Sequence, residues 1–178
     1  MRAHVPPDGE LDPPGDPESV ARVICLRQLA QRARTRAELA AVLQRRGVPD
    51  DAARSVLDRF TDIGLIDDGA LAASFAMAVH RERGLAGRAV AMKLRRRGID
   101  EATLQAAVGQ IDAESEADAA RLLVARRRKS LQGLEPQAQA RRLVGLLARR
   151  GYPPGLAYQI VRESLACPEI ADAADIED

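Results

Sequence analysis

A short motif of two arginines followed by a glycine occurs three times in this chain of 178 residues and limits the folds open to it. The motif ends at Gly47, Gly98 and Gly151, so that successive copies lie 51 and 53 residues apart. A leucine stands four residues before each glycine, and aliphatic residues recur eight residues before it and nine after it. Recurrence over this distance is typical of tandem supersecondary units, and we therefore expect a repeat protein.

The composition favours repeats built from α-helices. Aromatic residues make up 2% of the chain and tryptophan is absent, so the core must consist of Leu, Val, Ile and Ala. No apolar run approaches the roughly 18 to 20 residues that span a membrane. The N-terminus has no basic segment followed by an apolar stretch, as a signal peptide would have. We expect a cytoplasmic protein in which Cys25 and Cys167 are free thiols.

Periodicity and capping signals predict nine helices and no strand. Thr35 and Glu38 form a capping box before the second helix, and Asp67 or Asp68 caps the fourth. Leu65 and Ile66 are expected in the core, followed by a buried stripe of Leu71, Phe75 and Val79 at four-residue steps. The main predicted helices cover residues 19–33, 35–46, 88–97, 101–111, 137–150 and 154–166.

The nine helices fall into three sets of three, and each set is too small to bury its own apolar stripe well. Neighbouring sets should therefore share faces. Proline, glycine and acidic residues with few apolar ones indicate a disordered leader at the N-terminus, and acids dominate the C-terminus. The predicted organisation is a leader (1–18), three three-helix repeats (19–66, 67–111 and 112–166) and an acidic tail (167–178).

Charge is distributed unevenly along the chain. The formal net charge is only +1, because eleven acids lie in residues 1–18 and 163–178 against one base, Arg2. The body between them, residues 19–162, carries 26 basic and 15 acidic residues. A basic body between acidic ends indicates an acidic or polyanionic partner.

The candidate partner-contacting residues are the basic clusters of the second and third sets. Basic residues in a last helical turn also interact favourably with the helix dipole, so the recurring arginine pairs serve equally well as scaffold or as contacts. Four adjacent charges at residues 126–129 point all round a helix, which favours contact with a partner or a phosphate. The candidates are Arg88, Lys93, Arg95, Arg96, Arg97, Arg126, Arg127, Arg128, Lys129, Arg141, Arg142, Arg149 and Arg150.

Nothing in the sequence indicates a catalytic site, a metal site or a bound cofactor. His80 lies on a predicted helix without a nearby Cys or Ser, and we interpret it as a partly exposed helical residue. The acid pairs 50–51 and 67–68 are better explained by helix N-termini than by a metal, because carboxylates there face the positive end of the dipole. Glycines occur singly, and no phosphate-binding loop is present. We therefore expect a protein that is not an enzyme.

The repeated pattern, the turn Gly64-Leu65-Ile66-Asp67-Asp68 with Leu71-Ala72 after it, and Arg97-Gly98-Ile99-Asp100 resemble the RecX regulatory proteins of bacteria. The resemblance covers roughly residues 20–165 and is most specific between Asp67 and Asp100. It implies three tandem three-helix repeats, similar to helix-turn-helix units, in an elongated and curved molecule. It also implies a protein that lies in the groove of the RecA–DNA filament and restrains the ATPase activity and strand exchange of RecA.

Two functional hypotheses remain open at this point. In the first, a monomer binds the RecA nucleoprotein filament and limits filament growth during recombination, DNA repair and the SOS response. In the second, the repeats bind single- or double-stranded DNA directly, with a steep dependence on salt. Aromatic residues do not alternate with the basic ones, which argues against base stacking. The acidic tail would compete for the basic faces, which argues against tight binding to bare DNA.

Overall fold

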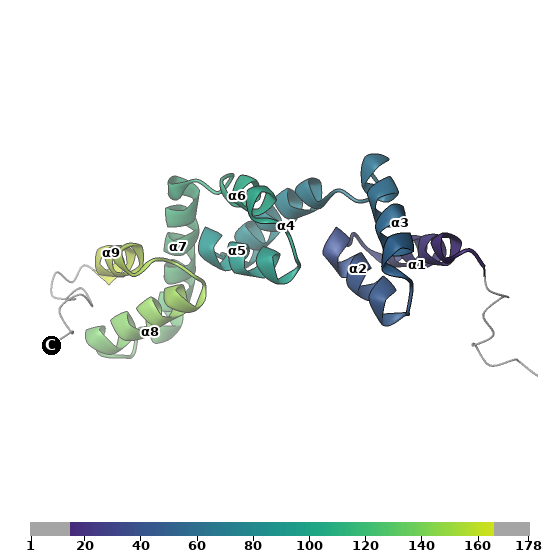
Figure 1. The fold of residues 1–178 in the computed structure, drawn as a ribbon. Coiled ribbons are helices and arrows are strands. Elements are labelled where there is room, and N and C mark those ends of the chain that lie inside the picture. Colours follow the sequence, from purple (N-terminus) through teal and green to yellow (C-terminus); the bar gives the residue numbers. More distant parts are fainter. Residues whose placement is uncertain (1–14, 166–178) are drawn as a thin grey trace, which may run out of the picture. The chain divides into compact units, whose positions relative to one another are not determined.

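The computed structural model of the chain describes residues 15–165, and within them it contains nine α-helices, one short 3₁₀ helix and no β-strand (Figure 1). The predicted all-α fold of three helical sets is confirmed. Residues 1–14 of the predicted leader, and the whole predicted tail with Cys167, lie outside the described residues. The helices are α1 (Pro17–Gln31), α2 (Arg36–Arg45), α3 (Asp50–Asp62), α4 (Asp68–Arg83), α5 (Gly87–Arg96), α6 (Glu101–Val108), α7 (Ala113–Arg128), η1 (Lys129–Leu131), α8 (Pro136–Arg149) and α9 (Pro154–Leu165).

The first compact unit extends to Asp67 and contains α1, α2 and α3. Helix α1 begins at Pro17, two residues before the predicted start, because the Asp16 side chain accepts a hydrogen bond from the Glu18 backbone and proline suits a first helical turn. The capping box at α2 is confirmed. Thr35 Oγ1 accepts from the Glu38 backbone at 3.0 Å, and the Glu38 carboxylate accepts from the Thr35 backbone at 3.2 Å.

Each copy of the repeated motif ends a helix with the same turn. The three glycines adopt left-handed φ values of +71°, +77° and +90°. Each glycine N–H donates to the carbonyl three residues back at 3.0 Å, and the next residue donates to the carbonyl of the leucine five residues before it. This pair of bonds is the Schellman motif, which requires a residue that tolerates positive φ. The residues after the glycines, Val48, Ile99 and Tyr152, are all buried.

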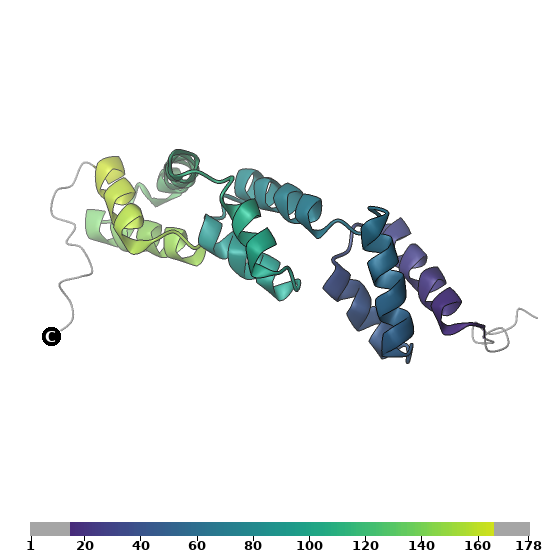
Figure 2. The ribbon, with the colours of Figure 1, turned by 45° about the horizontal axis from the view of Figure 1, so that its top comes forward.

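The second compact unit begins at Asp68 and holds α4–α9. Helices α4, α5 and α6 form one group, and α7, α8 and α9 form another (Figures 1 and 2). Each group encloses its own apolar cluster. The recurring aliphatic residues form both cores: Val90, Leu94, Leu143 and Leu147 are fully buried. The periodic positions inferred from the sequence therefore do face inward.

The two halves of this second unit share a core. Ala86, at the start of α5, is fully buried within the cluster of the third helical set. Its N–H donates to the Arg150 carbonyl at 3.0 Å, and Tyr152 Oη donates to the Gly84 carbonyl at 3.1 Å. The Gly87 N–H donates to the Glu116 carboxylate at 2.7 Å. These bonds join residues far apart in the sequence and fix the second set against the third.

Two predicted core positions, Leu65 and Leu71, are wrong, and a third, Phe75, only borders the core. Leu65 is 46% exposed, and only Ile66 of that pair enters the core, because the turn at Gly64 directs neighbouring side chains to opposite sides. On α4 the buried stripe is Ala72, Ala76 and Val79, whereas Leu71 and Phe75 are half-buried at its edge. Small residues allow α4 to approach its neighbours closely, so residues 72 and 76 are buried where residues 71 and 75 were predicted, whereas Val79 is buried as predicted.

None of the helices in the described part of the chain is long and apolar enough to cross a membrane.

Candidate functional site

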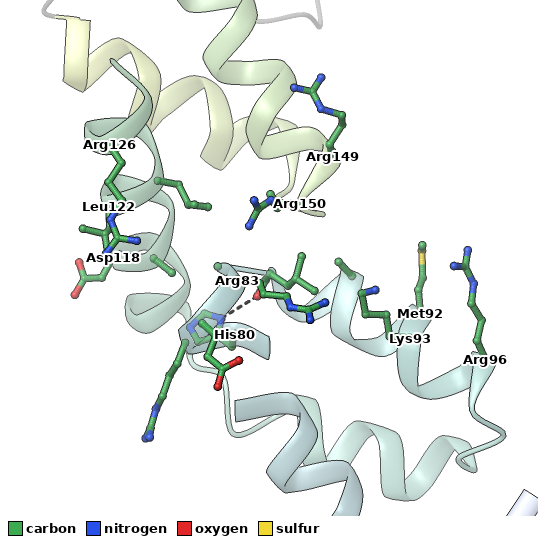
Figure 3. A pocket seen from close by; sticks show the side chains of 17 residues that line it. His80, Arg83, Met92, Lys93, Arg96, Asp118, Leu122, Arg126, Arg149 and Arg150 are labelled. Carbon is green, nitrogen blue, oxygen red and sulfur yellow. Dashed lines mark hydrogen bonds between the residues drawn. The ribbon is translucent and has the colours of Figure 1, made fainter. Parts of the chain in front are cut away.

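A cleft of about 850 Å³ opens within the second unit (Figure 3). One wall is α7, which contributes Leu122 and Arg126, and the opposite wall is α5, which contributes Met92 and Arg96. The end of α4 and the end of α8 close the cleft between these walls. The same hydrogen bonds that join the two helical sets therefore set the distance between its walls.

The base of the cleft is held by the turn between α4 and α5. His80 is buried, and its Nδ1 lies 2.9 Å from the Leu85 carbonyl oxygen, so that Nδ1 carries the proton and donates. The prediction of a partly exposed histidine is wrong, because this bond draws the ring beneath the turn. Gly84 adopts φ +58°, and a Cβ there would lie 2.8 Å from Leu123 Cδ1. Glycine thus permits both the turn and the close approach of α7.

The rim of the cleft is strongly basic. Seven of its lining residues carry a positive charge and two carry a negative charge. One of the two acids, Asp118, already pairs with Arg121 at 2.8 Å. Within residues 15–165, no ion pair engages the cationic side chains that line the walls and the α8 end of the cleft. These side chains are Lys93, Arg96, Arg126, Arg149 and Arg150.

A second groove of about 610 Å³ lies beside the first and has a different composition. Four arginines and Leu146 line it, and the lining contains no acid. Arg149 also lines the first cleft, so that the two depressions share one guanidinium. We call this second depression the arginine groove; its arginines are Arg127, Arg141, Arg142 and Arg149.

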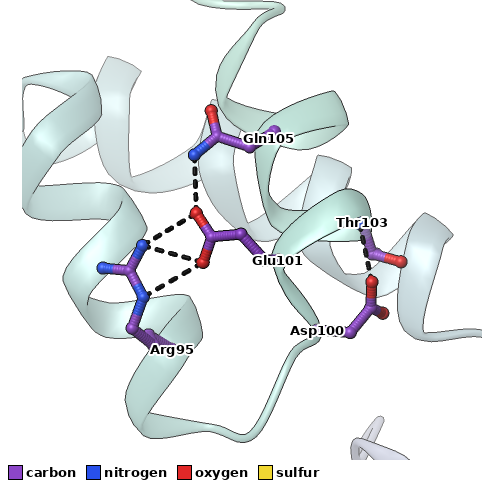
Figure 4. Close-up of polar contacts among 5 residues, drawn as sticks. All are labelled: Arg95, Asp100, Glu101, Thr103 and Gln105. Atoms are coloured by element: carbon purple, nitrogen blue, oxygen red, sulfur yellow. Dashed lines mark hydrogen bonds and ion pairs between the residues drawn. The ribbon is translucent and has the colours of Figure 1, made fainter.

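The structure thus gathers eight of the thirteen predicted contact residues in these two depressions. Arg95 instead pairs with Glu101 at 2.9 Å, and the Glu101 carboxylate also accepts from Gln105 (Figure 4). These two hydrogen bonds, Gln105 first, lower the pKa of Glu101. Arg97 lies 5.5 Å from the centre of the Phe75 ring, a cation–π contact. Both arginines therefore support the scaffold of the second set.

The remaining three predicted residues, Arg88, Arg128 and Lys129, are exposed outside both depressions. The lining residues of the cleft that sequence reasoning missed include two cations, Arg81 and Arg83, and two exposed apolar side chains, Met92 and Leu122. A signal for Leu122 was available: three consecutive apolar residues on a helix cannot all face one core, so that one of residues 122–124 had to point outward.

The paired acids behave as residues of helix N-termini. Asp50 and Asp51 occupy the first turn of α3, and Asp68 opens α4. No group of three or more His, Cys, Asp or Glu side chains in the described residues is placed to hold a metal ion. The lining of the cleft also lacks a nucleophile paired with a base. What the lining offers to a ligand is charged and apolar side chains.

Three protein-family models match most of the chain. They describe the first three-helix domain of RecX (residues 21–60), the second (67–108) and the third (114–161). The regulatory protein RecX of Streptomyces coelicolor is 47% identical over 154 residues, covering 86% of this chain and 82% of that protein. That of Thermobifida fusca is 47% identical over 164 residues, covering 89% of each.

Solved structures agree with the fold. A crystal structure of RecX from Lactobacillus salivarius is similar with a TM-score of 0.76 at 17% identity, covering 83% of this chain and 96% of that chain. A second crystal structure, of a regulatory protein RecX, has a TM-score of 0.73 at 21% identity. The helical repeats are therefore an architecture that this chain shares with proteins of distant sequence.

Proposed function

Because the chain belongs to the RecX family of regulatory proteins, we propose that it inhibits RecA by binding the RecA–DNA filament. In this proposal it acts by binding and not by catalysis. Bound along the filament groove, it restrains ATP hydrolysis, strand exchange and filament growth. The predicted division into repeats at residues 19–66, 67–111 and 112–166 belongs to the same proposal, with each repeat a separate point of attachment.

The observation that carries the proposal is the pair of adjacent depressions in the second unit. The cleft combines several apolar side chains with cations, a lining that suits a protein partner, whereas the arginine groove offers four guanidinium groups and a single apolar residue, Leu146. A nucleoprotein filament presents both kinds of partner side by side. Arginine suits either, because its planar guanidinium binds carboxylates and phosphates through two parallel hydrogen bonds.

The proposed mechanism is mechanical restraint. A rigid protein attached to neighbouring subunits of a filament resists the relative movements that accompany nucleotide turnover. In the second unit, rigidity comes from the shared core around Ala86 and the hydrogen bond between Tyr152 and Gly84. A ligand shifts such an equilibrium only by its preference for one filament state, so the restraint should fall when the contacts weaken.

A titration of DNA-dependent ATP hydrolysis tests this function. Purified protein is added to RecA filament preformed on single-stranded DNA, and hydrolysis should fall at substoichiometric to equal amounts. Unchanged hydrolysis across that range would reject the proposal. Replacing Arg126, Arg127, Arg128 and Lys129 by alanine should weaken filament binding in a pull-down while circular dichroism shows unchanged helicity. Unchanged binding would assign this cluster to the solvated surface.

A second candidate function, direct binding to DNA, is favoured by the arginine groove alone. Each phosphate contact that is lost should lower the salt slope of DNA binding by about 1. The double variant R141A/R142A should therefore lower that slope by about 2. R54A/R59A, two exposed arginines of α3, removes the same charge and should leave the slope nearly unchanged. Equal slopes in both variants would assign DNA binding to net charge and not to the groove.

The two functions can be separated by affinity. If the chain inhibits RecA through the filament, it should bind the filament much more tightly than the same DNA without RecA at equal salt. Equal affinity for both would favour the DNA-binding alternative. Removing residues 168–178 should strengthen binding to bare DNA if the acidic tail competes for the basic surfaces, and unchanged or weaker binding would dismiss that competition.

A further inference from the structure

The cleft differs from the arginine groove in one respect that bears on its partner. Two large apolar side chains face solvent there: Met92 is 45% exposed on α5 and Leu122 is 52% exposed on α7. They stand on opposite walls among cationic side chains (Figure 3). Isolated exposed apolar residues are common on protein surfaces, but two in one concave basic site mark a place where apolar area can be buried by a ligand.

Nucleic acid fits this cleft poorly. The sugar–phosphate backbone satisfies cations but offers no aliphatic group to cover Met92 and Leu122. Bases could stack on aromatic rings, yet the only ring in the lining is that of His80, which is buried beneath the Leu85 carbonyl. The arginine groove, with four guanidinium groups and one leucine, is the better phosphate site of the two.

An acidic protein segment satisfies both parts of the lining. Its carboxylates would pair with rim cations such as Lys93, Arg96 and Arg126, which have no ion-pair partner within the described residues. An apolar side chain between those carboxylates would cover Met92 and Leu122. On a helix, residues three or four apart share one face, so that two apolar residues one turn apart can reach both walls.

We propose that the cleft binds an acidic segment of a partner protein that carries apolar side chains one helical turn apart. The statement that this segment belongs to a protein subunit of the filament rests on the proposed function. The preference of the cleft for an acidic segment with apolar side chains does not depend on that function. In this proposal the cleft binds a protein segment and the arginine groove binds phosphate.

Methionine methyl NMR offers a direct test, because the chain has three methionines and, of the two within residues 15–165, only Met92 lines the cleft. Met77, half-buried on α4 and absent from the lining, provides an internal control. The full chain with ¹³C-labelled methionine methyl groups is titrated with three probes of equal charge. They are a short glutamate-rich peptide with two leucines one turn apart, the same peptide with serines in place of the leucines, and single-stranded DNA.

The leucine peptide should shift the Met92 methyl signal at a concentration about tenfold below that needed by the serine peptide, from the apolar area covered. Met77 should stay in place, and DNA should leave Met92 unmoved. Equal binding of both peptides, a Met92 shift with DNA, or no shift at all would overturn the proposal. A Met92 shift on deleting residues 168–178 would also overturn it, because the chain's own tail would then be the occupant.

A second experiment uses the double variant M92S/L122S to test whether the cleft contributes to inhibition of the filament. Both side chains are about half exposed, so the fold should persist, which unchanged helicity and thermal unfolding would verify. The variant should need about tenfold more protein for the same inhibition of ATP hydrolysis, with unchanged affinity for bare DNA. Full inhibition by this variant would overturn the assignment to the filament. Absent inhibition by the unaltered chain would instead reject the proposed function, while the peptide titration still decides the cleft.

Discussion

The Arg-Arg-Gly turn of the first helical set and that of the third have the same backbone geometry in different surroundings. Gly47 and Gly151 both end a helix at positive φ with the same two hydrogen bonds. A Cβ on Gly47 would meet nothing within 4 Å, whereas a Cβ on Gly151 would lie 2.6 Å from Ala89 Cβ and 2.9 Å from Ala89 N. Gly47 is needed only for the turn that ends its own helix, whereas Gly151 is also needed for the close packing of the third set against the second.

The largest expected effect follows from this difference. Gly47→Ala should lower the free energy of unfolding by about 1 kcal/mol, the cost of a left-handed alanine. Gly151→Ala adds a clash with the Ala89 backbone, which cannot rotate away, and should cost about 3 kcal/mol or more. Urea unfolding measures both, by circular dichroism for the whole chain and by tyrosine fluorescence for the second unit.

Both tyrosines of the chain, Tyr152 and Tyr158, lie in that second unit, which makes the fluorescence signal specific to it. Gly155→Ala provides the control, since it is an unobstructed glycine in the first turn of α9 and should not destabilise the protein. If Gly47→Ala and Gly151→Ala lower the free energy of unfolding equally, the close approach of residue 151 to Ala89 adds no further destabilisation.

A smaller effect is expected from the residue after each glycine. Val48 in the first set and Tyr152 in the third are both buried, but only Tyr152 donates a hydrogen bond to another set, at Gly84. Tyr152→Phe should lower the free energy of unfolding by about 1 to 2 kcal/mol, because the Gly84 carbonyl loses its donor. Tyr158 fluorescence would follow the unfolding of this variant. A change below the error of the measurement would mean that water replaces the hydroxyl at no cost.

Alkaline pH should affect the two units in different windows. Burial raises the pKa of the Cys25 thiol from 9.0 to about 11 in the first unit. Burial, and then the charge of Glu116, raises the pKa of Tyr152 from 10.0 to about 12 in the second. A raised pKa in the folded state means that the stability is complete below the unfolded value and is lost as pH rises towards the folded one.

The first unit should therefore weaken from pH 9 to 11, and the second from pH 10 to 12. Urea midpoints across this range measure the loss. Cys25→Ala should flatten the first window and Tyr152→Phe the second, each without altering the other. A window that persists in its own variant would point to a different titrating group.

The smallest expected effect distinguishes the helix caps at acid pH. Thr35 caps α2 with a hydroxyl that does not ionise, whereas Asp100 and Asp112 cap α6 and α7 with carboxylates. Hydrogen bonds from Thr103 and Ser115 lower the pKa of these two acids from 3.8. A lowered folded pKa means that the stability is present above the unfolded value and is lost as pH falls below it.

The double variant D100N/D112N keeps the accepting oxygens and removes both titrations. Its urea midpoint for the second unit should depend less on pH below 3.8 than that of the unaltered chain. Thr35→Ser, which preserves a hydroxyl cap in the first unit, is the control and should leave the acid dependence unchanged. Identical acid curves for D100N/D112N and the unaltered chain would show that these caps do not govern acid sensitivity.

Features set by neighbouring residues were predictable from the sequence. The glycine turns, the capping box at Thr35 and the cap at Asp100 each depend on a few adjacent positions, and the buried leucines repeat with them. Features set by close packing were not. On α4 the small residues Ala72 and Ala76 are buried, whereas large apolar residues were expected in the core. Small side chains allow helices to pack closely, and the spacing of large apolar residues in the sequence does not show this.

The same distinction between local features and features set by packing holds for the candidate site. Its charges were visible as runs of arginine, but the sequence does not say which arginines face one another. Arg96 and Arg126 meet in one cleft only because Tyr152 and Ala86 fix the third set against the second, and Tyr152 and its partner Gly84 are 68 residues apart. Met92 and Leu122 were missed because an exposed apolar side chain indicates a binding site only when cationic side chains lie beside it in the folded protein.

The burial of Ala86 in the core of the third set has a consequence for cooperativity. In tandem repeats, stability is approximately the sum of the intrinsic stability of each repeat and a coupling term for each junction. A residue of one repeat that completes the core of the next enlarges that coupling term. The second and third repeats should therefore melt in a single transition, and neither should be stable when expressed alone.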